Sequence, residues 1–210
     1  MPYRRSTAVQ ERLDATRSTL VQAASELVAE HGYAGCSVAA VAERAGVATG
    51  SVYRHHAGKG ALFAEVFRVA TAREVAAVAA ALAGSGPVSE RAAAGVQTFA
   101  TRALRAPRMA WALLAEPVDP LVEAERLAFR RAYRDLFAAL VAEGVASGEL
   151  PAQDPEVTAA AVVGAIAEAL VVPLHEGRVA PGTDPARSTV TALTRVVVRA
   201  LGARHPLEQP

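Results

Sequence analysis

A short helical pattern that ends at a glycine constrains the fold of this chain more than any other feature. Val38, Val41, Ala42 and Ala45 recur at i, i+3, i+4 and i+7, so they share one face of a helix. Gly46 follows immediately, and glycine tolerates the left-handed conformation that a tight turn between helices requires. The pattern therefore predicts a short amphipathic helix that stops abruptly.

A second short helix is expected directly after this turn, over residues 48–55. Val47 and Val52 are spaced to point back toward the first helix, and Ala42 is small enough to let the two helices approach closely. Ser37 stands where the first helix needs an N-cap. Two short helices in this arrangement form a helix-turn-helix, whose second helix lies in the major groove of DNA in proteins that use the motif for recognition.

The composition indicates an all-α protein. Hydrophobic residues make up 52% of the 210 residues, with alanine, a strong helix former, the commonest among them, and alternating runs of β-branched residues are scarce. One cysteine, Cys36, excludes an intramolecular disulfide and suits a reducing cytoplasm. Arg, Glu or Gly interrupts every apolar run and the N-terminus lacks an apolar signal segment, so we expect neither a membrane span nor a signal peptide.

Positive charge is slightly concentrated around the helix-turn-helix. The whole chain carries a net charge of +1, whereas residues 1–60 hold seven basic side chains against five acidic ones. Lys59 is the only lysine, and Arg4 and Arg5 stand together near the N-terminus. This distribution is compatible with DNA binding but does not establish it.

Turn residues divide the chain into a small N-terminal part and a larger helical one. Gly84-Ser85-Gly86-Pro87 is the clearest break, and Gly-Pro or Asp-Pro pairs precede several later helices. After the first helix, which ends at Gly32, we expect helices over 38–45, 48–55, 59–82, 87–105, 108–115, 120–147, 155–175 and 185–202. The predicted divisions are a helix-turn-helix domain (1–58), a connecting helix (59–82) and a larger helical domain (83–210).

The segment from Thr16 to Phe67 resembles the tetracycline-repressor-like (TetR) family of bacterial regulators. Its first helix reads TRSTLVQAASELVAEHGY, followed by SVAAVAERAGV and TGSVYRHHAGKGALF. Three positions depart from the family's pattern: His56 replaces a common Phe, Ala48 replaces a common Ser or Thr cap, and Gly60 replaces a common Glu. The resemblance implies a DNA-binding domain joined by the connecting helix to a ligand-binding and dimerisation domain.

The resemblance also implies roles for individual residues in binding a double-stranded DNA operator. Thr49 and Ser51 would face base edges or phosphates, and Arg44 would reach a base. Tyr53, His55, Lys59 and Ser37 would hold phosphates, whereas Arg4 and Arg5 would lie in a minor groove. Since the second helix offers few base-reading side chains, we expect specificity to depend partly on DNA shape and dimer spacing.

For the C-terminal domain, the resemblance implies a small-molecule effector and a homodimer. The expected effector contacts are mostly aromatic: Phe99, Arg102, Trp111, Phe129, Tyr133, Phe137 and His175. The last two helices would pair across a two-fold axis through apolar side chains: Val162, Val163, Ile166, Leu170, Leu193, Val196, Val197 and Leu201. Effector binding would change the separation of the two DNA-reading helices and release DNA.

These expectations describe a cytoplasmic, ligand-responsive repressor that is not an enzyme and needs neither cofactor nor metal. No Gly-rich phosphate loop, G-x-S-x-G elbow or H-E-x-x-H motif supports catalysis. One alternative is a helical small-molecule-binding protein or enzyme whose helix-turn-helix no longer functions. Another is an activator or architectural DNA-binding protein that takes no ligand.

Overall fold

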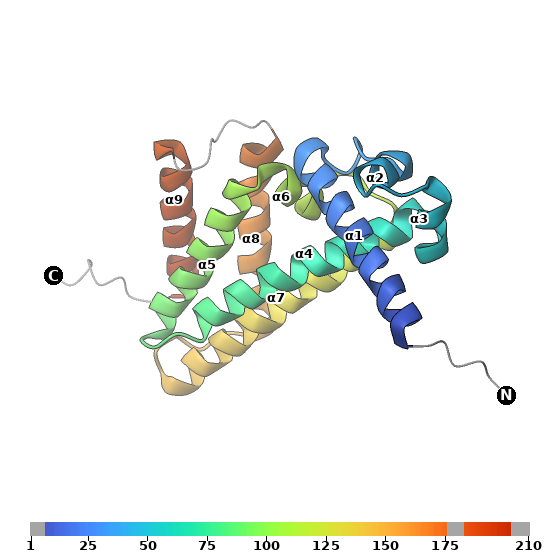
Figure 1. Ribbon diagram of the computed structural model, residues 1–210. Coiled ribbons are helices and arrows are strands. Elements are labelled where there is room, and N and C mark those ends of the chain that lie inside the picture. Colours follow the sequence, from blue (N-terminus) through green and yellow to red (C-terminus); the bar gives the residue numbers. More distant parts are fainter. Residues whose placement is uncertain (1–6, 176–182, 203–210) are drawn as a thin grey trace.

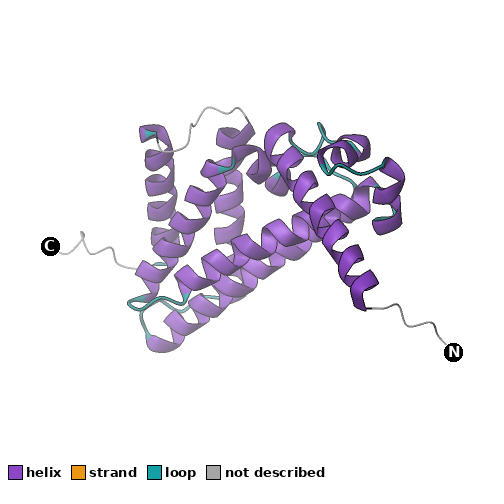
Figure 2. Cartoon of the chain, in the orientation of Figure 1, coloured by secondary structure: helices purple, strands orange, loops and turns teal. Residues whose placement is uncertain are grey.

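Helices make up most of the part of the chain that the structure describes (Figure 2). The computed structural model describes residues 7–175 and 183–202, and no strand occurs within these ranges. This confirms the predicted all-α class. The helices are α1 (Thr7–His31), α2 (Val38–Arg44), α3 (Thr49–His55), α4 (Lys59–Leu82), α5 (Val88–Arg105), α6 (Pro107–Leu114), α7 (Pro120–Ser147), α8 (Pro155–His175) and α9 (Asp184–Ala200).

The helices form a small head and a larger bundle that share one long element. Figure 1 shows α1, α2 and α3 at one end of the molecule, and α4 running diagonally from them into the bundle. Helix α7 lies along α4 over much of its length, while α5, α8 and α9 stand across this pair. Helix α6 lies between the bundle and α1, and it contacts α1 on one side and α5 and α8 on the other.

The helix-turn-helix forms where the sequence predicted it, for local reasons that the structure makes explicit. The Ser37 hydroxyl accepts a hydrogen bond from the Ala40 N–H at 3.1 Å and so caps α2. Gly46 has φ of +67° in the turn, a conformation that costs other residues strain. Val52 is buried against α1 and α2, whereas Ala48 provides no side-chain cap for α3.

Two hydrophobic cores stabilise the chain, and they do not divide at the predicted domain boundary. The core of the head includes Leu20, Phe63 and Phe67 from α1 and α4. Ala112 and Leu113 of α6 belong to the same core, although the sequence assigned them to the C-terminal domain. The head therefore folds against part of the bundle.

The connection between α6 and α7 is bound to the head by an acidic clamp, formed by Glu116 and Asp119. The Glu116 carboxylate is buried and accepts hydrogen bonds from the backbone N–H groups of Tyr33 at 2.8 Å and Ala34 at 2.9 Å. The Tyr33 hydroxyl donates to the Asp119 carboxylate. Because its carboxylate is used in this way, Asp119 makes no side-chain cap for α7, unlike Asp154, which accepts from two N–H groups of α8.

A buried arginine ties the end of α6 to α7. The Arg126 guanidinium donates to the carbonyl oxygens of Ala112 at 2.9 Å, Leu113 at 3.2 Å and Glu116 at 2.5 Å. It also pairs with the Glu123 carboxylate at 2.6 Å. The carbonyl groups at a helix C-terminus have no partner within the helix, so Arg126 satisfies groups that burial would otherwise leave unpaired.

Most of the residues predicted to form the dimer interface face the interior of the chain on α8 and α9. Six of the eight side chains are buried within the chain itself: Val162, Ile166, Leu170, Leu193, Val197 and Leu201. Only Val196 is strongly exposed, while Val163 is half-buried. The apolar faces of α8 and α9 that were assigned to a partner pack within the chain instead, and apolar residues also occupy much of the outer side of α8, so periodicity alone does not separate core from interface there.

Helix α8 is also long and apolar enough to cross a membrane by length and composition alone. The mean hydropathy of its most apolar 18-residue stretch is 2.1, and only 28% of that stretch is buried. Gly164 and Glu168 interrupt its apolar run, as expected from the sequence, and one helix of this kind is weak evidence for a membrane span. Core and interface helices of soluble proteins share this composition, and α8 packs against α6 and α7.

Candidate nucleic-acid interface and ligand cavity

The exposed side of α3 offers a narrow polar surface at the end of the head. Thr49, Tyr53 and Arg54 are exposed there, and 56% of Tyr53 is accessible even though its ring is apolar. Ser51 and His55 are half-buried at the edges of this surface. Val52 alone points inward, so the short helix has one buried residue and an outer face free to meet a partner.

Arg44 is held against α1 by carboxylates. Its guanidinium donates to the two carboxylate oxygens of Glu30 at 2.8 and 2.7 Å, and Glu26 lies 3.6 Å away. The hydrogen bonds with Glu30 raise the pKa of Arg44 above its ordinary value. A contact between Arg44 and a base would therefore require this pair to open. Arg4 and Arg5, predicted to lie in a minor groove, fall outside the described residues.

Lys59 lies over aromatic rings at the start of α4. Its ammonium nitrogen is 4.4 Å from the centroid of the Tyr33 ring and 5.8 Å from that of Phe63. It also lies 3.5 Å from the Tyr33 carbonyl oxygen. Lys59 is half-buried in this position and stabilises the turn at Tyr33, the same turn that binds Glu116 and Asp119. Ser37 is exposed at the start of α2, with its hydroxyl oxygen already used as the N-cap.

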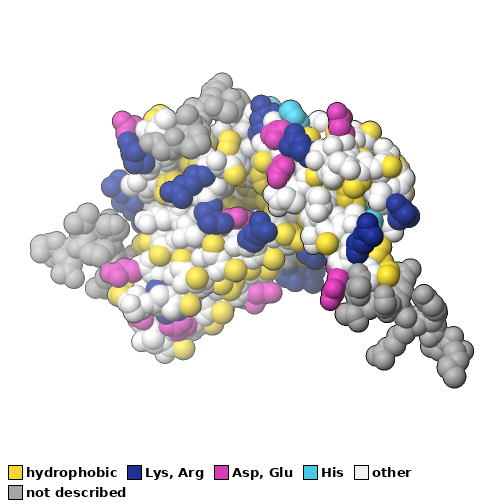
Figure 3. Space-filling view, in the orientation of Figure 1, with side chains coloured by type: hydrophobic (Ala, Val, Ile, Leu, Met, Phe, Trp, Pro, Cys, Tyr) yellow, Lys and Arg dark blue, Asp and Glu magenta, His cyan; other side chains and the backbone are white. Residues whose placement is uncertain are grey.

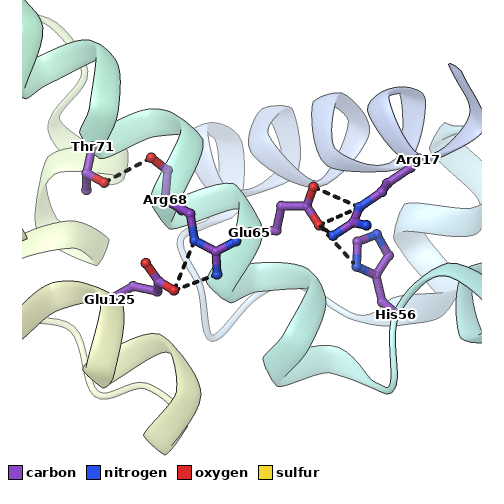
Figure 4. A network of polar contacts seen from close by, with 6 residues as sticks. All are labelled: Arg17, His56, Glu65, Arg68, Thr71 and Glu125. Atoms are coloured by element: carbon purple, nitrogen blue, oxygen red, sulfur yellow. Dashed lines mark hydrogen bonds and ion pairs between the residues drawn. The ribbon is translucent and has the colours of Figure 1, made fainter. Parts of the chain in front are cut away.

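His56 follows α3 and is the buried member of a polar network with Glu65 and Arg17 (Figure 4). Its Nδ1 atom lies 3.6 Å from the Glu65 carboxylate, which accepts two hydrogen bonds of 2.9 and 2.6 Å from Arg17 through Oε2. The other nitrogen, Nε2, is buried, and no described residue forms a hydrogen bond with it. Burial lowers the pKa of His56, so the imidazole is neutral near neutral pH.

Two small cavities lie inside the bundle, one on each side of a shared wall. The outer cavity, of about 60 Å³, lies between α4, α5, α6 and α7. The inner cavity, of about 20 Å³, lies between α5, α6, α7 and α8. Phe99, Leu114 and Phe129 line both. Figure 3 shows the region between α5 and α6 as a recess with hydrophobic side chains at its floor and charged side chains around it.

Five of the seven predicted effector contacts line these cavities: Phe99, Arg102, Phe129, Tyr133 and Phe137. The other two, Trp111 and His175, line neither. Their rings pack against each other at an interplanar angle of 57°, with centroids 4.5 Å apart, and join α6 to the end of α8. Val163 and Ile166, predicted as dimer contacts, line the inner cavity instead.

The cavity walls combine aromatic edges with a few polar groups. Tyr133 meets Phe129 and Phe99 edge-to-face, with centroids 4.6 and 5.1 Å apart. Arg102 and Glu74 form a bidentate ion pair beside the outer cavity, with distances of 2.6 and 2.8 Å. Within the described ranges the buried Tyr133 hydroxyl has no hydrogen-bond partner, and burial raises the pKa of this phenol well above its ordinary value.

Sequence reasoning missed several residues that the structure places in these sites. Arg54 gave a usable signal, since it is one turn from Ser51 on a helix whose inner face was already assigned. Glu74, Glu116 and Arg126 gave none, because their roles depend on which helices cross. Among the described residues, no group of three or more His, Cys, Asp or Glu side chains has the arrangement of a metal site.

Comparisons with known proteins agree with this arrangement. Residues 20–66 match the family model described as bacterial regulatory proteins of the tetR family, and residues 85–170 match that of the tetracyclin repressor-like C-terminal domain. No curated protein matches the chain.

Several solved structures share the fold. The fatty acid degradation regulator FadR of Bacillus halodurans superposes with a TM-score of 0.75 at 18% identity, covering 96% of this chain and 100% of that one. FadR of Bacillus subtilis, solved in complex with stearoyl-CoA, gives 0.72 at 19% identity, covering 90% and 99%. A TetR/AcrR-family regulator of Thermobifida fusca gives 0.65 at 26% identity, covering 90% and 98%.

The two matched segments together span the head and most of the bundle, and they correspond to the exposed α3 surface and to the walls of the cavities. Together with the shared fold, they establish the chain's family: it belongs to the tetR family of bacterial regulatory proteins, the DNA-binding transcription regulators.

Proposed function

We propose that this protein is a homodimeric repressor that binds an inverted-repeat operator and leaves it when a small apolar effector enters the bundle. The observation that carries the proposal is the position of α6. Met109, Ala110 and Leu113 of this helix line the outer cavity, while Ala112 and Leu113 are part of the core of the head. One short helix thus contacts both the effector site and the DNA-binding domain.

DNA recognition would centre on the outer face of α3. Thr49 would face bases, Tyr53 would donate to a phosphate through its hydroxyl, and Arg54 would add a charged contact at the end of the helix. Ser51 and His55 would contribute from the edges of the same surface. Lys59 and Arg44 would act mainly by bracing the head, since both already have partners within it.

A second copy of the chain would cover the exposed side of α8 and α9. Val157, Val172 and Val196 are 67%, 54% and 57% exposed on these helices, which is unusual for valine on a free surface. Ala161, Gly164 and Ala165 lie between Val157 and Val172 on α8 and would let a partner helix approach closely. Two-fold pairing would place the two α3 helices about 35 Å apart, on successive turns of the major groove.

Release would begin at the shared wall of the cavities. The present cavities are small, so an effector must displace Phe99, Leu114 or Phe129 to fit. Movement of Leu114 moves the end of α6, which Arg126 and the acidic clamp connect to the turn after α1. A displaced turn would change the orientation of the head relative to its partner and weaken operator binding.

The test is fluorescence anisotropy with double-stranded DNA from the region upstream of this protein's gene, titrated at several salt concentrations. Arg54→Gln should weaken binding and reduce the slope of log K against log salt by about one for each protomer. Arg134→Gln, which removes an arginine of α7 that is also exposed, is the matched control. Equal affinities and slopes for the two variants would contradict the assignment of α3 as the DNA-binding element.

A further inference from the structure

The most informative unexplained group in the bundle is the Tyr133 hydroxyl. Tyr133 is only 3% exposed, and its buried hydroxyl has no hydrogen-bond partner among the residues that the structure describes. Buried polar groups are nearly always paired, because leaving one unpaired costs the free energy of its lost hydration. A hydroxyl kept in this state, in the wall of a cavity, is suited to pair with a group that enters the cavity.

A charged pair lies across the shared wall from this hydroxyl. Arg102 and Glu74 line the outer cavity, and Tyr133 lines the inner one, with Phe99, Leu114 and Phe129 between them in the walls of both. Arg102 is paired with Glu74, but both side chains are partly exposed, at 41% and 30%, so the pair can open without stranding a buried charge. A ligand oxygen that reached Tyr133 would therefore lie within the influence of a guanidinium.

The net charge of the cavity walls is positive. Arg102 lines the outer cavity and Arg130 the inner one, against the single carboxylate of Glu74. Arg130 donates to the Leu114 carbonyl oxygen at 3.2 Å, so it too is anchored at the shared wall. The remaining lining is hydrophobic or aromatic, which suits an apolar body and excludes a second charged group on the ligand.

The size of the cavities limits that body. With volumes of about 60 and 20 Å³, they hold a few water-sized groups as they stand. Rotation of Phe99 or Phe129 would join them, because these side chains line both. Joined as they stand, the cavities are smaller than the cavity of about 150 Å³ that takes benzene, so a single aromatic ring or a short alkyl chain would also have to displace the shared wall, and a long acyl chain would not fit.

From these observations we infer that the effector is a small monocarboxylic acid, whose carboxylate accepts a hydrogen bond from Tyr133 and pairs with Arg102, and whose apolar part joins the two cavities. This inference rests on the proposed function, since it specifies the ligand of the same site. Glu74, released from Arg102, would turn to solvent. A charge-assisted hydrogen bond from a buried phenol and a bidentate guanidinium are the contacts that best recognise a carboxylate.

Isothermal titration calorimetry of the full-length protein tests the inference with four probes: phenylacetate, hexanoate, and the neutral amides phenylacetamide and hexanamide. The acids should bind at least tenfold more tightly than their amides. Tyr133→Phe should weaken binding of the acids about tenfold and of the amides less, and Arg102→Gln should abolish the preference for acids. Arg134→Gln, on the exposed side of α7, should bind all four probes as the wild type does.

Dodecanoate serves as the size control and should bind more weakly than hexanoate. If the amides bind as tightly as the acids, if Tyr133→Phe binds the acids unchanged, or if dodecanoate binds best, the inference is wrong. Anisotropy with operator DNA separates this outcome from failure of the proposed function. Acids that bind but do not release DNA contradict the function alone, whereas neutral compounds that release DNA without any acid binding contradict the inference alone.

Discussion

The acidic clamp between the α6–α7 connection and the head should be a major source of stability. In Glu116→Gln, one carboxylate oxygen becomes an NH₂ group that faces a backbone N–H, and the other becomes a neutral acceptor. The two bonds affected are those from Tyr33 at 2.8 Å and Ala34 at 2.9 Å, both at a side chain only 7% exposed.

The expected magnitude follows from the two hydrogen bonds. Losing one bond to a buried charged group costs about 1.5–3 kcal/mol, and weakening the second to a neutral bond costs about 0.5–1 kcal/mol. The free energy of unfolding should therefore fall by roughly 3 kcal/mol, which for a chain of this length lowers Tm by roughly 6–12 °C. The same variant should respond less to effector, because the head is no longer tied to α6.

Urea denaturation followed by circular dichroism measures this change, at a fixed protein concentration because a dimer's stability depends on it. Glu125→Gln is the matched control, since Glu125 forms a surface ion pair with Arg68 at 2.6 Å and such pairs contribute about 0–1 kcal/mol. If the two variants lose equal stability, the clamp does not hold the head and the route from cavity to DNA must be sought elsewhere.

Three further perturbations have defined outcomes. Burial lowers the pKa of His56 below its ordinary value of about 6.5, so the unfolded chain binds a proton at a higher pH than the folded chain does. The free energy of unfolding should therefore fall as pH drops below about 6.5. His56→Phe should flatten this pH dependence in thermal melts recorded at several pH values, and an unchanged slope would contradict it. Arg126→Met leaves the carbonyl oxygens of Ala112, Leu113 and Glu116 without their donor and should cost about 3–5 kcal/mol in chemical denaturation, whereas a loss under about 1 kcal/mol would contradict its role. Val172→Glu with Val196→Glu places charge on the exposed side of α8 and α9 and should yield monomers in sedimentation analysis, while intact dimers would place the interface elsewhere.

Local sequence signals predicted most of the fold because they act over a few residues. Ser37, Gly46 and the Pro residues that open later helices determine where helices begin and end, and the observed bounds differ from those predicted by only a residue or two. Burial was harder to predict in α8, where valine and alanine occupy every side and the choice of inner face depends on how α6 and α7 cross it.

The candidate site was predictable only in part for the same reason. Phe129, Tyr133 and Phe137 of α7 were expected as effector contacts, and all three line the inner cavity, although a stripe of aromatic residues at helical spacing is as typical of plain core. The position of Arg44 was not predictable, since its pairing with Glu30 joins α2 to α1. Nor did any local pattern link Glu116 to Tyr33, which are far apart in the sequence and meet only through tertiary packing.

The central claim is that two copies of α3 read an inverted repeat. Selection of bound sequences from random double-stranded DNA by the full-length protein, followed by sequencing, tests this most directly. We predict enrichment of an inverted repeat whose half-sites have centres about one helical turn apart or a multiple of it, lost in Tyr53→Ala with Arg54→Ala. Enrichment of single half-sites, of no sequence, or of the same repeat by the double variant would contradict the claim.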